Sequence, residues 1–237
     1  MTSTPLLSVI IPIGPDELSV PQGLLDDLQH ISVTREIIFV TCNESFDEGY
    51  RQHCTKALGG SGVFWMNAGQ GRAIQMNAGA LSASGQYLWF LHVDSRFDQS
   101  LFVSLIDNLS VYPERLHYCL LKFLADGPSS MVFNGMGANL RSRILGAPFG
   151  DQGFAIKRSV FSSLGGYPEN AAYGEDHLFV WYARQQGVKL KCCRKYLKTS
   201  ARKYTQKGWF ALTSRYQYLW IKQAMPELCT LIKKRYF

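Results

Sequence analysis

The stretch GRAIQMNAGALSASGQYLWFLHVD, residues 71–94, decides how this chain folds. Residues 70–84 carry alanines at helical spacing and stop at Gly85, which predicts a helix. Residues 86–94 form an apolar, aromatic run that predicts a buried strand ending in His92 and Asp94. A helix that leads directly into a buried strand is the repeating unit of a parallel α/β sheet.

Similar units lie on both sides of this stretch. Further strands are predicted over residues 6–12, 35–40, 62–67, 116–125 and 188–194, and further helices over residues 18–31, 99–111, 176–186 and 204–224. Residues 126–153 read as part loop and part helix, and no linker or repeat is visible. The pattern predicts one domain over residues 1–237, with its ligands at the carboxyl ends of the strands.

Composition argues against several classes of protein: disordered, zinc-ribbon, secreted and membrane-spanning proteins. The chain has 237 residues, of which 46% are hydrophobic and 18% charged, so a disordered protein is excluded. The six cysteines have no C-x-x-C pair and no zinc spacing, which argues against a metal ribbon. The N-terminus does not resemble a secretory signal, and no apolar run approaches the length of a spanning helix. A cytoplasmic location is expected.

Charge is distributed unevenly along the chain. Residues 1–183 carry a net charge of −6 and residues 184–237 a net charge of +13, which gives the total of +7. A basic segment favours an anionic partner, but no nucleic-acid-binding motif accompanies it, so nucleic acid is not expected. The aromatic and basic helix predicted over 204–224 has two interpretations: a peripheral contact with the inner face of the membrane, or a helix packed on the domain with its aromatics in the core. The packed helix is the favoured interpretation.

Two motifs flank the predicted strand 86–94. His92 and Asp94 are two residues apart, so on a strand they would point to the same face, where a carboxylate can hold a divalent cation. A turn-forming Asp94 and a core His92 explain the spacing equally well. The glycines of Gly69-Gln70-Gly71-Arg72 open the preceding helix, where phosphate is attracted, although such glycines are more often simply turns.

Two further motifs come later in the chain. Glu175 and Asp176 begin an apolar helix, where acids serve as caps or, alternatively, as a general base at a loop–helix junction. Gly150-Asp151-Gln152-Gly153 places polar side chains between glycines, which suits a binding loop or a tight turn.

Taken in order, these pieces resemble a known family. SVIIP, the stretch from GRAIQMNAG to FLHVDSR, GDQGFAIKRSVFSSLGGYPE and GEDHLFVWYARQQG resemble a family 2 glycosyltransferase, over about residues 6–210. The likeness is greatest to the subgroup called rSAM/selenodomain-associated transferase 2, also labelled arsenosugar-biosynthesis glycosyltransferase. It implies the GT-A fold, a three-layer α/β/α sandwich with a mainly parallel central sheet, a Rossmann-like nucleotide half over about residues 1–95 and an acceptor half over about residues 96–237.

The resemblance also implies roles for individual residues. His92 and Asp94 stand where the family carries its D-x-D motif, so Asp94 would ligate Mg²⁺ or Mn²⁺ beside His92. Asp176 would be the catalytic base for the acceptor, with Glu175 orienting a neighbouring group. The implied donor pocket comprises Pro12, Asp16, Glu17, Gly71, Arg72 and Gln75, and Asp151 and Gln152 would face the sugar or the acceptor.

The sequence departs from the family pattern at two turns. The first strand is followed by IGPDE instead of a proline followed by N-E, and residues 41–45 read TCNES where the family has an acidic turn that grips the base. Asn43 or Glu44 would substitute there. The leading interpretation is an inverting transferase that uses a nucleotide-diphosphate sugar, with UDP favoured, and an unknown acceptor. The alternatives are a non-catalytic nucleotide- or membrane-binding relative and, ranked lower, a nucleotidyltransferase.

Overall fold

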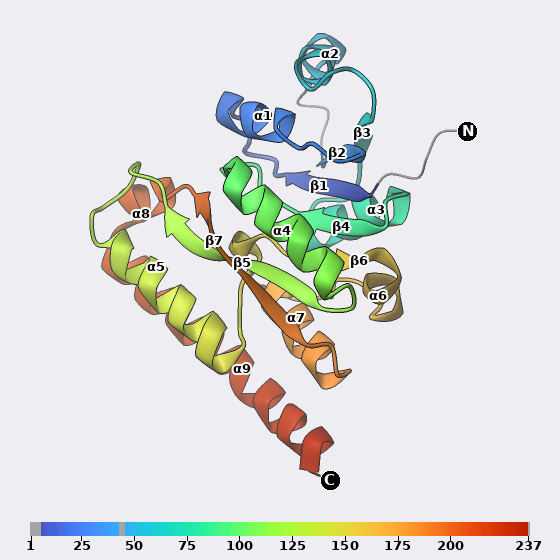
Figure 1. Cartoon of the computed structure of the whole chain (residues 1–237). Helices are drawn as coiled ribbons and strands as arrows, with labels where there is room; N and C mark the ends of the chain where they lie inside the picture. Colours follow the sequence, from blue (N-terminus) through green and yellow to red (C-terminus); the bar gives the residue numbers. More distant parts are fainter. Residues whose placement is uncertain (1–5, 43–45, 237) are drawn as a thin grey trace.

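The computed structural model describes residues 6–42 and 46–236, and its strands form one sheet (Figure 1). The strands are β1 (Leu7–Ile13), β2 (Arg35–Thr41), β3 (Val63–Asn67), β4 (Tyr87–Phe90), β5 (Leu116–Phe123), β6 (Ala155–Lys157) and β7 (Leu190–Thr199). Their order across the sheet is β3-β2-β1-β4-β6-β5-β7. Within the described ranges only β6 is antiparallel to its neighbours, β4 and β5. The predicted α/β class with a mainly parallel sheet is confirmed.

Helices cover both faces of this sheet. They are α1 (Gln22–Gln29), α2 (Glu48–Ala57), α3 (Arg72–Ser82), α4 (Gln99–Val111), α5 (Met131–Leu140), α6 (Arg158–Ser163), α7 (Glu175–Gln185), α8 (Arg202–Lys207) and α9 (Trp209–Tyr236). A π-helical turn, η1 (Arg141–Leu145), continues α5, and a short 3₁₀ turn, η2 (Gly150–Gln152), precedes β6.

The alternation of side chains along β1 explains the three layers. Val9 and Ile11 point to one face, where they join a core with α1, α2 and α4. Ile10 points to the other face, where α3, α6 and α7 supply a second core. Because both faces of the central strands are buried, these strands are apolar at almost every position. The predicted three-layer sandwich is therefore confirmed.

Several predicted boundaries need correction. The strand predicted over 86–94 ends at Phe90, where its pairing with β6 and β1 ends. The helix predicted over 204–224 is divided at Gly208, whose φ is 80°, into α8 and a longer α9. Three elements were not predicted at all: α2, β6 and α6.

The favoured interpretation of the C-terminal helix is only partly right. Trp220 packs against Ala147 and Trp181, so one face of α9 is attached to the domain. Phe210, Tyr216 and Tyr218, however, are exposed rather than in the core. No helix in the described part of the chain is both long enough and apolar enough to cross a membrane.

Candidate active site

A cleft of about 970 Å³ opens where the parallel strands end. Its walls come from the segments after β1, β4 and β7, the starts of α3 and α7, the η2 turn, and the helices α5 and α9. The chain order reverses between the neighbouring strands β1 and β4, which is where open α/β sheets bind ligands. Eleven sequence-predicted site residues line it: Pro12, Asp16, Glu17, Gly71, Arg72, Gln75, His92, Asp94, Asp151, Glu175 and Asp176.

Arg72 is the central cation of this cleft. It follows Gly71, whose φ of 134° is accessible to glycine, and it occupies the first turn of α3. Its Nε donates to Glu175 at 2.5 Å, and its Nη1 lies 3.2 Å from Nε2 of His92. Burial acts to lower the pKa of Arg72, but the charges of Asp176 and Glu175 outweigh it and raise that pKa. Arg72 therefore stays charged and links α3 to the start of α7.

His92 is held as a neutral imidazole. A guanidinium can only donate, so Nε2 of His92 accepts from Arg72 and its ring proton is on Nδ1. Burial, followed by the positive charge of Arg72, lowers the pKa of His92 to about 4. The lone pair of Nε2 is thus already used by Arg72.

Asp176 is an ionised carboxylate in the wall of the cleft. Its Oδ2 accepts from the backbone N–H of Gly150, and its Oδ1 accepts from the N–H of His177 at 2.8 Å. Burial acts to raise the pKa of Asp176, but Arg72 and these two N–H groups outweigh it, so the pKa is lowered. The start of α7 therefore presents a carboxylate that is charged at neutral pH.

Asp94 reaches the cleft from a turn and not from a strand. Because β4 ends at Phe90, the two-residue strand spacing does not explain why His92 and Asp94 both face the cleft. Thr199, at the end of β7, donates to Oδ1 of Asp94 at 3.3 Å and is its one hydrogen-bond partner among the described side chains. The carboxylate keeps acceptor capacity for a ligand or a cation.

Asp151 and Gln152 are neighbours in the η2 turn, but their side chains point in different directions. Oδ1 of Asp151 is buried and has no hydrogen-bond partner within the described residues, and burial raises the pKa of Asp151 to about 6. Gln152 points away from the cleft into the domain, where its Nε2 donates to the carbonyl of Cys119 at 2.8 Å. The cleft therefore receives Asp151 but not Gln152.

The predicted nucleotide-binding residues are brought together only in part. Gln75 bridges two strands, because its Nε2 donates to the carbonyls of Ile13 and Val40, each at 2.7 Å. That bond pattern gives Gln75 a structural role as well as a place in the cleft wall. Asn43 and Glu44 lie outside the described residues.

Arg141 and Gln223 also line the cleft, and neither belongs to a motif that the sequence reveals. Arg141 begins the π-helical turn, and its guanidinium lies 3.5 Å from the ring centroid of Phe149. Gln223 of α9 accepts from His177 and donates to the carbonyl of Tyr173, so it joins α7, α9 and the loop before α7. The end of β7, α8, α9 and the residues between them contribute further residues to the cleft: Thr199, Ser200, Arg202, Lys203, Tyr204, Tyr216 and Trp220.

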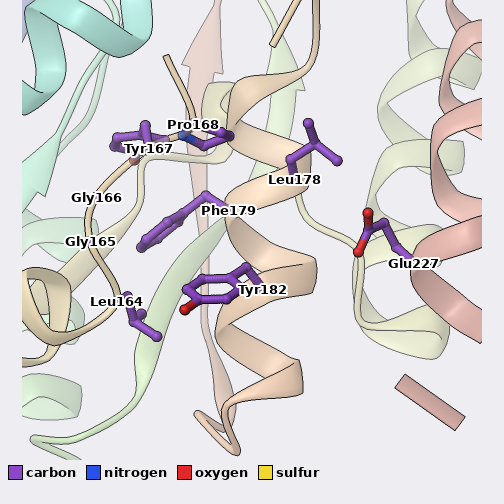
Figure 2. Close-up of a pocket in the computed structure, with 9 residues that line it drawn as sticks. All are labelled: Leu164, Gly165, Gly166, Tyr167, Pro168, Leu178, Phe179, Tyr182 and Glu227. Carbon is purple, nitrogen blue, oxygen red and sulfur yellow. The ribbon is translucent and has the colours of Figure 1, made fainter. Parts of the chain in front are cut away.

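A second, smaller cavity lies farther along α7, beyond the residues that line the cleft. It measures about 390 Å³, and Figure 2 shows Phe179 and Tyr182 of α7 beside the segment 164–168, with Glu227 reaching in from α9. It is mainly apolar, and its described lining contains none of the predicted site residues. The titratable groups converge in the larger cleft, which is therefore the candidate active site.

Comparison with solved structures places the fold among known proteins. A mannosyltransferase from Pyrobaculum calidifontis, crystallised with GDP-Man and Mn²⁺, superposes with a TM-score of 0.69 at 16% identity, over 99% of this chain and 70% of its own. TarS 1–349 from S. aureus, in complex with UDP-GlcNAc, superposes with a TM-score of 0.64 at 17% identity, over 83% of this chain. The fold is GT-A.

At these identities the comparison shows the fold and not the reaction. The matched region spans only 58% of TarS 1–349, so this chain corresponds to part of that protein. No protein-family model matches the chain, and no curated protein matches it significantly.

Proposed function

We propose that this protein is an inverting glycosyltransferase that moves a sugar from a nucleotide-diphosphate sugar to an acceptor. The observation that carries the proposal is the convergence of Asp94, ionised Asp176 and Arg72 in one cleft at the carboxyl edge of a GT-A sheet. The solved neighbours hold UDP-GlcNAc and GDP-Man, which favours a nucleotide sugar as donor and leaves UDP and GDP to be distinguished by binding. In this proposal residues 1–95 bind mainly the donor and residues 96–237 the acceptor.

Arg72 and the start of α3 are suited to the donor diphosphate. The first N–H groups of a helix have no intrahelical partner and attract phosphate, and Gly71 allows close backbone approach. The Arg72 side chain is 44% exposed, so a bound phosphate can reach its guanidinium. Glu175 holds this guanidinium in place by the ion pair, which is the positioning role proposed for that acid.

The residues fit a divalent cation at Asp94 better than at His92. Asp94 has unused carboxylate lone pairs, whereas Nε2 of His92 accepts from Arg72. No cluster of three or more His, Cys, Asp or Glu side chains in the described ranges is arranged to hold a metal. One carboxylate is sufficient where the diphosphate supplies the other ligands, as is usual for Mg²⁺. A bound Mg²⁺ or Mn²⁺ would offset the charge that develops on the departing diphosphate.

Asp176 is the proposed general base. As the acceptor oxygen forms its bond to the anomeric carbon, its proton passes to Asp176, and the bond from that carbon to the diphosphate oxygen breaks. Attack from the face opposite the leaving group inverts the anomeric centre. The unpartnered Oδ1 of Asp151 is suited to a hydroxyl of the sugar or the acceptor.

The proposal is tested by separating binding from turnover. Calorimetry with UDP and GDP, with and without Mn²⁺, measures nucleotide affinity, and hydrolysis of the matching nucleotide sugar measures turnover. Asp94→Ala should abolish the Mn²⁺-dependent part of binding. Asp176→Asn should leave binding nearly unchanged and reduce turnover by about 10²-fold or more.

Asp98→Asn is the matched control, because Asp98 caps α4 outside the cleft and asparagine caps equally well. Its binding and turnover should equal those of the wild type. Binding of nucleotide with no turnover of any nucleotide sugar would favour a non-catalytic relative. An active Asp176→Asn variant would remove Asp176 from the mechanism.

A further inference from the structure

Helix α5 and the turn after it expose a row of apolar side chains. Met131, Gly135 and Ala138 are buried, and Gly135 packs close to the backbone of β5. The side of the helix away from these residues carries the exposed set, each member 61–70% exposed: Val132, Phe133, Met136, Leu140 and Ile144. Helix α5 itself contains no charged residue, so no long charged side chain of this helix covers the apolar row.

Helix α9 carries a second row of the same kind. Ile221, Met225, Leu228 and Ile232 follow one another at intervals of four, three and four residues, so they occupy one side of the helix. Phe210 lies eleven residues earlier, about three turns away, on the same side. All five are at least 40% exposed. These side chains form an apolar stripe that the domain does not cover, with Ser214 and Gln217 on the same side between Phe210 and Ile221.

The two helices lie next to each other. Asn134 of α5 donates to Thr213 and accepts from Nε1 of Trp209, and Arg141 lies over the ring of Trp220. Figure 1 shows α9 running along α5 at the outer side of the domain, towards the C-terminus. The exposed rows of both helices are here called the α5–α9 face. Gathered exposed apolar side chains of this kind mark interaction sites more often than chance exposure.

Positive charge borders the stripe. Arg215, Lys222 and Lys233 are spaced by seven and eleven residues, about two and three helical turns, and all are exposed. Lys222 and Lys233 directly follow Ile221 and Ile232, so the basic row runs beside the apolar one. The single acid of residues 184–237, Glu227, accepts from Gln185 of α7 and thus faces the domain.

We propose that the α5–α9 face docks on a bilayer that contains anionic lipid. The apolar rows would enter the boundary between headgroups and acyl chains, and the adjacent lysines and arginines would contact lipid phosphates and carboxylates. A second copy of the chain fits this face less well, because a two-fold contact would set one basic row against another. Since α5 and α9 also line the cleft, docking places the cleft beside the membrane surface.

Vesicle flotation tests the proposal with the full chain. Vesicles of phosphatidylcholine alone are compared with vesicles in which about one-third of the lipid is phosphatidylserine. The wild type should float with the anionic vesicles and be largely released at high salt, because salt screens the basic row. The Lys222→Gln/Lys233→Gln variant should bind about 25-fold more weakly, about fivefold for each lysine.

The apolar rows are tested by Phe133→Gln/Ile221→Gln/Met225→Gln, which should lose at least about tenfold in binding to both kinds of vesicle. The controls are Leu81→Gln, for an 89% exposed leucine on α3, and Lys56→Gln/Lys189→Gln, for the same change in net charge. Both controls should bind as the wild type does. None of the substituted residues lines the cleft, so binding of UDP without vesicles should be unchanged in all variants.

Three results would overturn the proposal. The first is a wild type that floats with neither kind of vesicle, and the second is controls that weaken binding as much as the test variants. The third is a wild-type dimer in sedimentation velocity that the apolar variant converts to a monomer while vesicle binding stays unaltered; the α5–α9 face would then bind a second copy.

Discussion

Removing the charge of Arg72 should reverse the pH dependence of stability. Glu175 and Asp176 are neighbouring carboxylates, 7% and 8% exposed, and Arg72 is the cation that they share. In the wild type the pKa of Asp176 is lowered, so its contribution to stability is present above the ordinary carboxyl pKa and is lost as the pH falls through the folded value. In Arg72→Met the two acids remain buried without that cation.

The structure gives the size and sign of the effect. Like charges and burial both raise a carboxyl pKa, so one of the two acids in the variant retains a proton on folding. The variant should then lose stability as the pH rises from about 4 to 6, by up to about 1.4 kcal/mol per pH unit for one proton. Arg72 is 44% exposed, so solvent screening keeps this loss well below that maximum, and the total cost of removing the charge at neutral pH is about 1–2 kcal/mol. For a chain of this length that is about 2–8 °C in Tm.

Differential scanning calorimetry from pH 4 to pH 8 measures how the stability of the wild type and of Arg72→Met depends on pH. Arg96→Met is the matched control. Arg96 pairs with Asp27 outside the cleft, and the side-chain exposures of that pair, 40% and 12%, resemble the 44% and 10% of Arg72 and Glu175. Because Asp26, the acid beside Asp27, is exposed, the control should be destabilised with only a small fall between pH 4 and 6, and it should bind nucleotide normally. Parallel pH profiles for the wild type and Arg72→Met would refute the shared-cation argument.

Three further outcomes follow from single residues. Because the pKa of Asp176 is lowered, turnover should stay level from neutral pH down to pH about 5, and a fall centred near neutral pH in a rate profile would contradict its role as the base. Because burial raises the pKa of Asp151 to about 6, the charged form destabilises the fold, and Asp151→Asn should raise stability by about 3 kcal/mol at pH 7.5 but not at pH 4 in thermal melts. Gly153 has a φ of 63° and a Cβ there would lie 2.7 Å from Leu197, so Gly153→Ala should cost about 2–4 kcal/mol in urea unfolding; Gly165→Ala, with a φ of 77° and open space, should cost only about 1 kcal/mol.

The helices and strands that the sequence predicts well are those in which burial produces a recognisable run or period of apolar residues. Strands β1 and β2 are buried on both faces and read as continuous apolar runs, and α4 begins and ends at its predicted residues. Helix α2 escaped prediction because Cys54 is its one buried residue, so it has no apolar period to detect. Strand β6 escaped because it is three residues long and depends on pairing with β4 and β5, which are distant in sequence.

Among the residues of the candidate site, too, those in local sequence patterns are predicted and those that depend on distant packing are not. Arg72 and Asp176 follow glycines at the starts of helices, Asp94 lies in the turn after β4, and all three face the cleft. Gln152 has the same local pattern but is drawn inward by buried carbonyls that the sequence cannot identify. Gln223 could not be found either, since it reaches the site only because α9 packs against α7.

Two acids of the cleft have pKa values that shift in opposite directions. Asp176 receives two backbone N–H groups and the charge of Arg72, and these lower its pKa. Asp151 has one oxygen with no partner among the described residues, and burial raises its pKa to about 6 even with Arg141 nearby. Environments that move two carboxyl pKa values apart mark a division of roles between proton acceptor and proton carrier. In the proposed mechanism Asp176 is ionised and can take the acceptor proton by its position, although its lowered pKa makes it a weak base, and the protonated form of Asp151 can donate a hydrogen bond to the sugar or the acceptor. Since both acids lie near Arg72, a phosphate that binds this cation would alter the pKa of each, so donor binding and the protonation of the site are coupled.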